Sequence, residues 1–182
     1  MTADFFCQAR KCATIAMEFL LGAKALNAAS LEGTPFLQRP TLALAGHGLE
    51  MMLKACCYVN GRKPPSNGKK GHDIAALWQD DICLAVRLHV YIHAGYAVEE
   101  ARLSGMFPDV PEDDEAQTLI EEYVKELCRL HGGTAGYPLR YPHECDEKAP
   151  PKHFVVDALC GAADDMAKSL SEFDLRHLRE GA

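Results

Sequence analysis

Apolar side chains recur along most of this chain at intervals of three and four residues, the spacing of one helix face. Where that spacing persists it predicts long α-helices, and no stretch of useful length alternates with the period of a β-strand. The predicted long helices cover residues 3–29, 40–60, 80–104, 113–131 and 153–179, and a short helix is expected after residue 73. We therefore predict an all-α fold, an up-and-down antiparallel bundle of four to five long helices plus a short helix.

Segments rich in glycine, proline or charge separate these helices. Pro40 suits a first helical turn, Asn60-Gly61 ends the second helix, and Asp73 is placed to cap the short one. The other connections are a basic loop over 61–71, an acidic loop over 104–116 and a long proline-rich segment over 134–152. A chain of 182 residues with such loops forms one domain, 1–182.

Three polar residues interrupt the otherwise apolar second helix. On a helical wheel His47, Glu50 and Lys54 share a narrow sector with the small residues Ala43 and Gly46. The rest of the helix is apolar on two sides, which is typical of the central helix of a bundle. The small residues predict that another segment approaches this sector closely.

Three interpretations of the sector remain open. A solvated Glu50–Lys54 pair would contribute only about 0.2–0.5 kcal/mol. If the sector is buried, both charges need partners, since losing one costs about 3–5 kcal/mol, and we expect Glu50 to anchor Arg140 with Lys54 nearby. Alternatively, these residues and Tyr141 line a small-ligand pocket.

Composition narrows the choice of partners and compartment. The formal net charge of -7 gives no broad attraction for nucleic acid, so DNA is not an expected partner. The eight cysteines show no paired spacing and are expected to be free thiols, which favours the reducing cytoplasm. No secretory leader or membrane span is predicted, because no uninterrupted apolar run is long enough.

The stretch "HGLEMMLKACCYVNG" followed by "GHDIAALW" resembles the HEPN family, whose central helix carries a Glu and a Leu-Lys-Ala before a Gly-His-Asp-Leu segment. The resemblance covers residues 43–78, and "LRYP" at 139–142 is similar to a downstream feature of one bacterial branch. It implies a helical bundle, a fold whose family members often dimerise. The binding or structural polar cluster that we predict from the wheel and the loops comprises His47, Glu50, Lys54, His72, Asp73, Arg140 and Tyr141.

By the same resemblance, the chain is a binding or interaction module of a bacterial stress, defence or toxin-antitoxin system. The implied partners are a second copy of the chain and either RNA or a nucleotidyltransferase-type protein, without a membrane. For His72 and Asp73, acid-base chemistry is an alternative, and the capping role of Asp73 is preferred.

A metal-independent ribonuclease is the alternative function. Family members with that activity carry an Arg, four to six residues and a His, and this chain has Arg87 and His93 with five between. By resemblance, Arg87 would stabilise the scissile phosphate and His93 would assist proton transfer from the ribose 2′-hydroxyl. The family usually has a polar residue after the Arg, where this chain has Leu88. The pair is about 9 Å apart along a helix and about 120° around it, so it could share a site only across a groove or a dimer seam.

Metal-ligating residue types occur without the spacing of a metal site. His89 and His93 are four residues apart, but Val90 stands where a metalloprotease has Glu, and the segment 143–153 lacks regular ligand spacing. No glycine-rich phosphate loop or Gly-x-Ser-x-Gly elbow occurs. We therefore expect neither a metal nor a cofactor.

Overall fold

The computed structural model describes residues 3–31, 37–66, 72–104, 115–132, 139 and 152–176. All regular structure in these ranges is helical, which confirms the predicted all-α bundle. The helices are α1 (Ala3–Leu31), α2 (Gln38–Val59), α3 (Ile74–Gln79), α4 (Leu84–Ser104), α5 (Ala116–His131) and α6 (Lys152–Lys168). Two 3₁₀ turns accompany them, η2 (Asp81–Cys83) and η5 (Leu170–Phe173).

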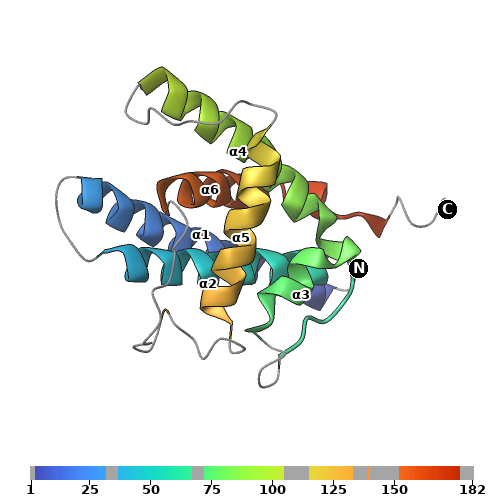
Figure 1. Ribbon diagram of the computed structural model, residues 1–182. Helices are drawn as coiled ribbons and strands as arrows, with labels where there is room; N and C mark the ends of the chain where they lie inside the picture. The colour runs from blue at the N-terminus through green and yellow to red at the C-terminus, as the bar shows by residue number, and fades with distance from the viewer. Residues whose placement is uncertain are drawn as a thin grey trace.

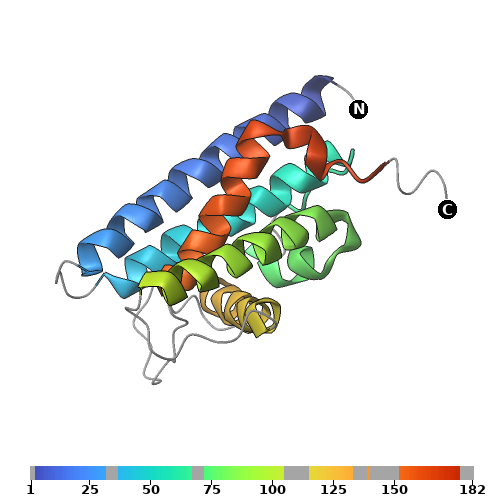
Figure 2. The ribbon, with the colours of Figure 1, turned by 90° about the horizontal axis from the view of Figure 1, so that it is seen from above.

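Helices α1 and α2 lie side by side and run in opposite directions, and α6 packs at an angle against both α1 and α4 (Figure 2). Helix α2 contacts each of the other helices and carries buried residues on both sides, so it is central, as its two apolar stripes predict. Helix α5 instead crosses the others at a steep angle (Figure 1). Hydrophobic periodicity alone does not predict this crossing.

The end of α2 is fixed by a glycine cap and a buried asparagine. Gly61 has a φ of 74°, and the amides of Gly61 and Arg62 donate to the carbonyls of Tyr58 and Cys57, which closes a Schellman motif. The side chain of Asn60 donates to the carbonyl of Phe173 at 2.8 Å and accepts from the amide of Leu175 at 2.8 Å. The C-terminal segment is thereby held against the end of α2.

Two helix boundaries differ from the prediction. The predicted helix over 153–179 ends at Lys168, because the chain turns at Ser169 and places Leu170 and Phe173 in the core from a 3₁₀ turn. The predicted helix over 80–104 begins at Leu84, after η2, whose first turn Asp80 caps by accepting from the amide of Ile82 at 2.9 Å. Periodicity locates apolar positions and does not distinguish a helix from a turn that buries the same side chains.

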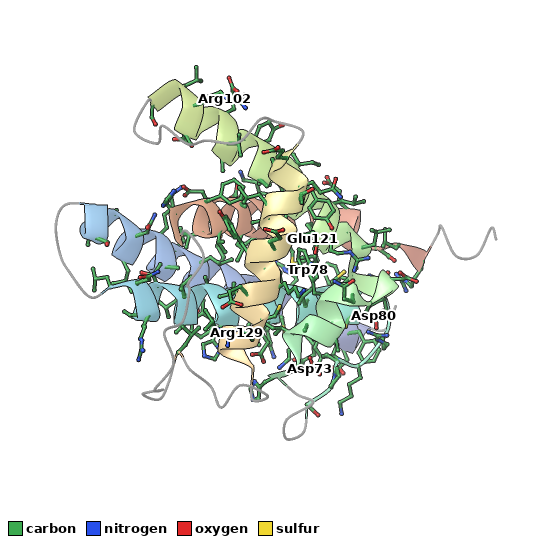
Figure 3. The ribbon with its side chains drawn as sticks, in the orientation of Figure 1. Asp73, Trp78, Asp80, Arg102, Glu121 and Arg129 are labelled. Carbon is green, nitrogen blue, oxygen red and sulfur yellow. The ribbon has the colours of Figure 1, made fainter. Side chains whose placement is uncertain are left out.

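The crossing helix α5 is attached to α3 and α4 through a single carboxylate (Figure 3). The indole Nε1 of Trp78 donates to the two oxygens of Glu121 at 3.2 and 3.1 Å, and the hydroxyl of Tyr91 donates to the same carboxylate. Burial and this bond to Glu121 raise the pKa of Tyr91 to about 12, so the phenol stays a donor at neutral pH. Helices α3, α4 and α5 meet at this carboxylate.

Helix α1 also has the length and apolar composition of a membrane-crossing helix between Asp4 and Ser30. Core helices of soluble proteins and N-terminal signal sequences pass the same test. In the structure α1 packs along α2 and α6.

The contact between α1 and α2 depends on Gly48. A Cβ at this position would lie 2.4 Å from Cγ of Leu20, a fully buried side chain. We expect Gly48→Ala to lower the free energy of unfolding, because overpacking a core costs about 1–3 kcal/mol. The matched control is Gly95→Ala in α4, where an added Cβ meets nothing within 4 Å.

Both substitutions gain the same helix propensity, about 1 kcal/mol, so their difference in urea denaturation isolates the α1–α2 contact. Equal unfolding free energies for the two variants would contradict this close approach.

Candidate functional site

A buried carboxylate on α2 collects donors from three parts of the chain. Glu50 is 1% exposed, and its Oε1 accepts from Nζ of Lys54 at 2.6 Å. Its Oε2 lies 3.0 Å from Nε2 of His131, and Nδ1 of His72 lies 3.1 and 3.2 Å from the two oxygens. Nδ1 of His47 lies 3.9 Å from Oε2. These five residues are called the Glu50 cluster below.

The local sequence accounts for this convergence. His47, Glu50 and Lys54 share one face of α2 by helical spacing, as the wheel predicts. His131, in the last turn of α5, lies against Gly46, where a Cβ would come within 2.6 Å of its Nδ1. The predicted close approach to the small residues of this sector is thus made by the end of α5.

The ring of His47 is held by two aromatic contacts. It stacks on Phe19 of α1 with centroids 5.2 Å apart and planes at 25°. It also meets the edge of His131 with centroids 4.5 Å apart and planes at 89°. Two imidazoles and one carboxylate are therefore oriented by packing around the same small volume.

Glu50 is ionised in the folded chain. Burial by itself raises the pKa of Glu50, but hydrogen bonds from His131, Lys54 and His72, together with the charge of Lys54, outweigh burial and hold that pKa at about 2. The solvated-pair interpretation is wrong, because the carboxylate is buried and the side chain of Lys54 is only 15% exposed.

The Glu50 cluster has a buried side, formed by Glu50 and His131, and a solvent-exposed side, formed by His47 and His72. The side chains of Glu50 and His131 are 1% and 2% exposed, whereas those of His47 and His72 are 29% and 44% exposed. Solvent therefore reaches the two outer histidines, and the carboxylate is buried behind them. The remaining predicted members, Arg140 and Tyr141, lie outside the described residues, so the Arg140 anchor stays a prediction.

Asp73 contributes to local structure and does not contact the carboxylate. Its Oδ1 accepts from the amide of Ala76 at 3.1 Å, which caps the start of α3 and confirms the preferred interpretation. The cap fixes the chain directly after His72, so the imidazole is presented to Glu50 from a defined turn.

A second carboxylate with two histidines joins α4 to α6. Oδ2 of Asp165 lies 2.8 Å from Nδ1 of His89 and 2.7 Å from Nε2 of His93. Burial raises the pKa of Asp165, and the bonds to the two histidines outweigh it and lower that pKa. A Cβ at Gly161 would lie 2.1 Å from Nδ1 of His93, so this glycine admits the ring against α6.

His93 also lines a groove of about 320 Å³ between α1, α4 and α6. The other polar side chains of the groove are Lys24, Tyr96, Glu100, Asp157 and Asp164. The groove mixes both signs of charge, and His93 at its wall is paired with Asp165 outside the lining, a combination that can move a proton.

The side chain of Arg87 binds backbone carbonyls at the end of α3, away from the Asp165 partner of His93. Its Nη1 donates to the carbonyl of Asp80 at 3.1 Å and to the carbonyl of Trp78, at the end of α3. The guanidinium thus satisfies carbonyls that the end of a helix leaves unpaired. The structure gives Arg87 and His93 separate partners within one chain.

Sequence reasoning missed His131 and Asp165. His131 lies 81 residues from Glu50, in a helix end where a histidine is ordinary because it favours the dipole. For Asp165 a signal existed, since Asp164-Asp165 interrupts an apolar helical run just as Glu50 does in α2.

Comparison of this chain with family models, with curated proteins and with solved structures found no match.

The ionised Glu50 predicts a specific acid dependence of stability. Its pKa of about 2 in the folded chain is below the 4.5 of a solvated glutamate. The stabilisation is therefore fully present above pH 4.5 and is lost as pH falls toward 2, and it amounts to at most about 3 kcal/mol. Glu50→Gln should lower the free energy of unfolding at pH 7 and flatten its dependence between about pH 5 and 2.

Denaturant titrations at a series of pH values measure this effect. The control is Glu126→Gln on α5, which removes a partly exposed carboxylate paired with Arg129 at 2.6 Å, and should leave the acid dependence unchanged. An acid limb as steep in Glu50→Gln as in the wild type would show that Glu50 is not the ionised group responsible.

Proposed function

We propose that this chain is a nonenzymatic, HEPN-like interaction module that works as a homodimer in a bacterial stress, defence or toxin-antitoxin system. The observation that carries the proposal is an apolar stripe on the outer face of α4. The resemblance of residues 43–78 supports the family, and it makes RNA or a nucleotidyltransferase-type protein the further partner.

The α4 stripe consists of exposed apolar side chains repeated mainly at intervals of four residues. Its members are Leu84, Leu88, Ile92, Tyr96 and Leu103, which are 38%, 48%, 51%, 65% and 80% exposed. Single exposed apolar residues are ordinary, but a row along one helix marks an interaction surface, and here the row runs from Leu84 to Tyr96 before the exposed Glu99 and Glu100 separate it from Leu103. Exposure rises toward the end of α4, whose last turns stand clear of the other helices (Figure 1).

A second copy of the chain suits this surface. An apolar row on one straight helix is self-complementary, so two copies can pair their α4 helices about a two-fold axis. Pairing would bury the row that the single chain leaves in water.

The ribonuclease is the second candidate, favoured by His93 with Asp165 at the rim of a groove. Against it, Arg87 already donates to two carbonyls at the end of α3, and binding a phosphate would require it to leave them. We therefore place interaction ahead of catalysis.

The dimer proposal predicts that a charge in the middle of the α4 stripe separates the subunits. Ile92→Glu should shift the chain from dimer to monomer at micromolar concentration, because a carboxylate buried across a symmetric apolar contact faces its own copy without a counter-charge. Sedimentation velocity over a concentration series measures the change. The control is Ile15→Glu, which places the same charge at an exposed aliphatic residue of α1, and this variant should remain dimeric.

A monomeric wild type, or loss of the dimer in Ile15→Glu alone, would refute pairing through α4.

The nonenzymatic assignment predicts no cleavage by the Arg87 and His93 pair. Structured and single-stranded RNA should persist equally with the wild type, Arg87→Ala and His93→Ala in the presence of EDTA. Gel electrophoresis of the RNA over time measures this. Decay with the wild type that both substitutions abolish would establish the ribonuclease instead.

A further inference from the structure

We propose that His47, Glu50 and His131 form a binding site for a divalent transition metal ion of the zinc class. One ligand atom from each residue lies within 4.8 Å of the other two. This inference is independent of the proposed interaction function, since the site lies on α2 and α5 and the stripe lies on α4.

The spacing of the ligand atoms fits one ion. With zinc bonds of about 2.0–2.2 Å in a tetrahedron, ligand atoms lie roughly 3.4 Å apart. Oε2 of Glu50 lies 3.0 Å from Nε2 of His131 and 3.9 Å from Nδ1 of His47, distances on either side of that value. The ligand nitrogens of the two histidines lie within 4.8 Å of each other, so a movement of the more exposed His47 ring toward His131 would close the three atoms around an ion.

The two oxygens of Glu50 have different surroundings. Lys54 donates to Oε1 at 2.6 Å, which leaves Oε2 directed toward the histidines. A carboxylate bound this way can coordinate through one oxygen while the ammonium neutralises the other. Two imidazoles and one carboxylate are the donor set of several catalytic zinc sites, in which water takes the fourth position.

Packing orients the imidazoles without help from the ion. Phe19 stacks on His47, and Gly46 lies against the Nδ1 side of His131, which leaves its Nε2 directed at Oε2. Two of the ligands are three residues apart on α2, and the third is fixed by the end of α5. His47, on the more exposed side, is where the ion would enter and where the fourth ligand would bind.

His72 separates this proposal from a purely electrostatic cluster. It bonds the same carboxylate through Nδ1, at 3.1 Å from Oε1, yet it is not among the three residues whose ligand atoms converge. Removing His72 removes a hydrogen bond to Glu50 and leaves the three metal ligands in place. Removing His47, whose 3.9 Å contact to Glu50 is weaker, removes a ligand.

The experiment uses the full chain, treated with EDTA, desalted and titrated with Zn²⁺ by calorimetry and with Co²⁺ by visible absorption. We expect one ion per chain and the intense d–d bands of low-coordinate Co²⁺. His47→Ala should weaken Zn²⁺ binding at least about 10–100-fold, because even outer-shell partners have effects of that size. His93→Ala should bind as the wild type does, and His72→Ala, which removes a hydrogen bond to the ligand Glu50, should weaken binding less than His47→Ala does.

His131→Gln tests the third ligand, and circular dichroism checks its fold. If His131→Gln fails to fold, the His47→Ala variant still tests the proposal, because His47 is partly exposed and its loss disturbs the core less. The proposal is overturned if the wild type binds no ion, if His47→Ala binds as well as the wild type, or if His72→Ala weakens binding as much as His47→Ala does.

Discussion

A carboxylate placed in the middle of a central helix must be supplied with donors, and much of this fold is arranged around that requirement. The ionised Glu50 would destabilise the core by several kcal/mol without partners. Its donors come from α2 itself, from the turn before α3 and from the last turn of α5. The charge of Glu50 therefore fixes the positions of the turn before α3 and the end of α5 relative to α2, which non-directional hydrophobic contacts define less sharply.

The same requirement explains why α5 crosses the bundle. Near its start Glu121 accepts from Trp78 and Tyr91, and at its end His131 bonds to Glu50. The two contacts are about 15 Å apart along the helix axis and face different helices. Between them the apolar face of α5 is buried. Polar contacts at both ends fix an orientation that the buried face alone would leave variable.

The sequence predicted features set by neighbouring residues, such as helices and caps, and did not predict contacts between residues far apart in the chain. The period of apolar residues gave the helices, the wheel placed His47, Glu50 and Lys54 on one side of α2, and capping chemistry gave Asp73. The end of α6 was missed because Leu170 and Phe173 keep helical spacing in a 3₁₀ turn. The bonds of Glu50 to His131 and of His93 to Asp165 could not be predicted, because they depend on how the helices pack and produce no recognisable spacing in the sequence.

The two histidine–carboxylate groups look alike and differ in what they can do. At Asp165 both imidazoles approach one oxygen from a single helix, and His89 is stacked on Phe173 with centroids 4.4 Å apart. That arrangement holds α4 to α6, and Arg87 holds the start of α4 to the end of α3. The inward polar residues of α4 thus attach it to the bundle, and its outward face carries the apolar stripe as far as Tyr96. Because the inward groups are used in holding the helix, we expect a partner to meet α4 through this stripe.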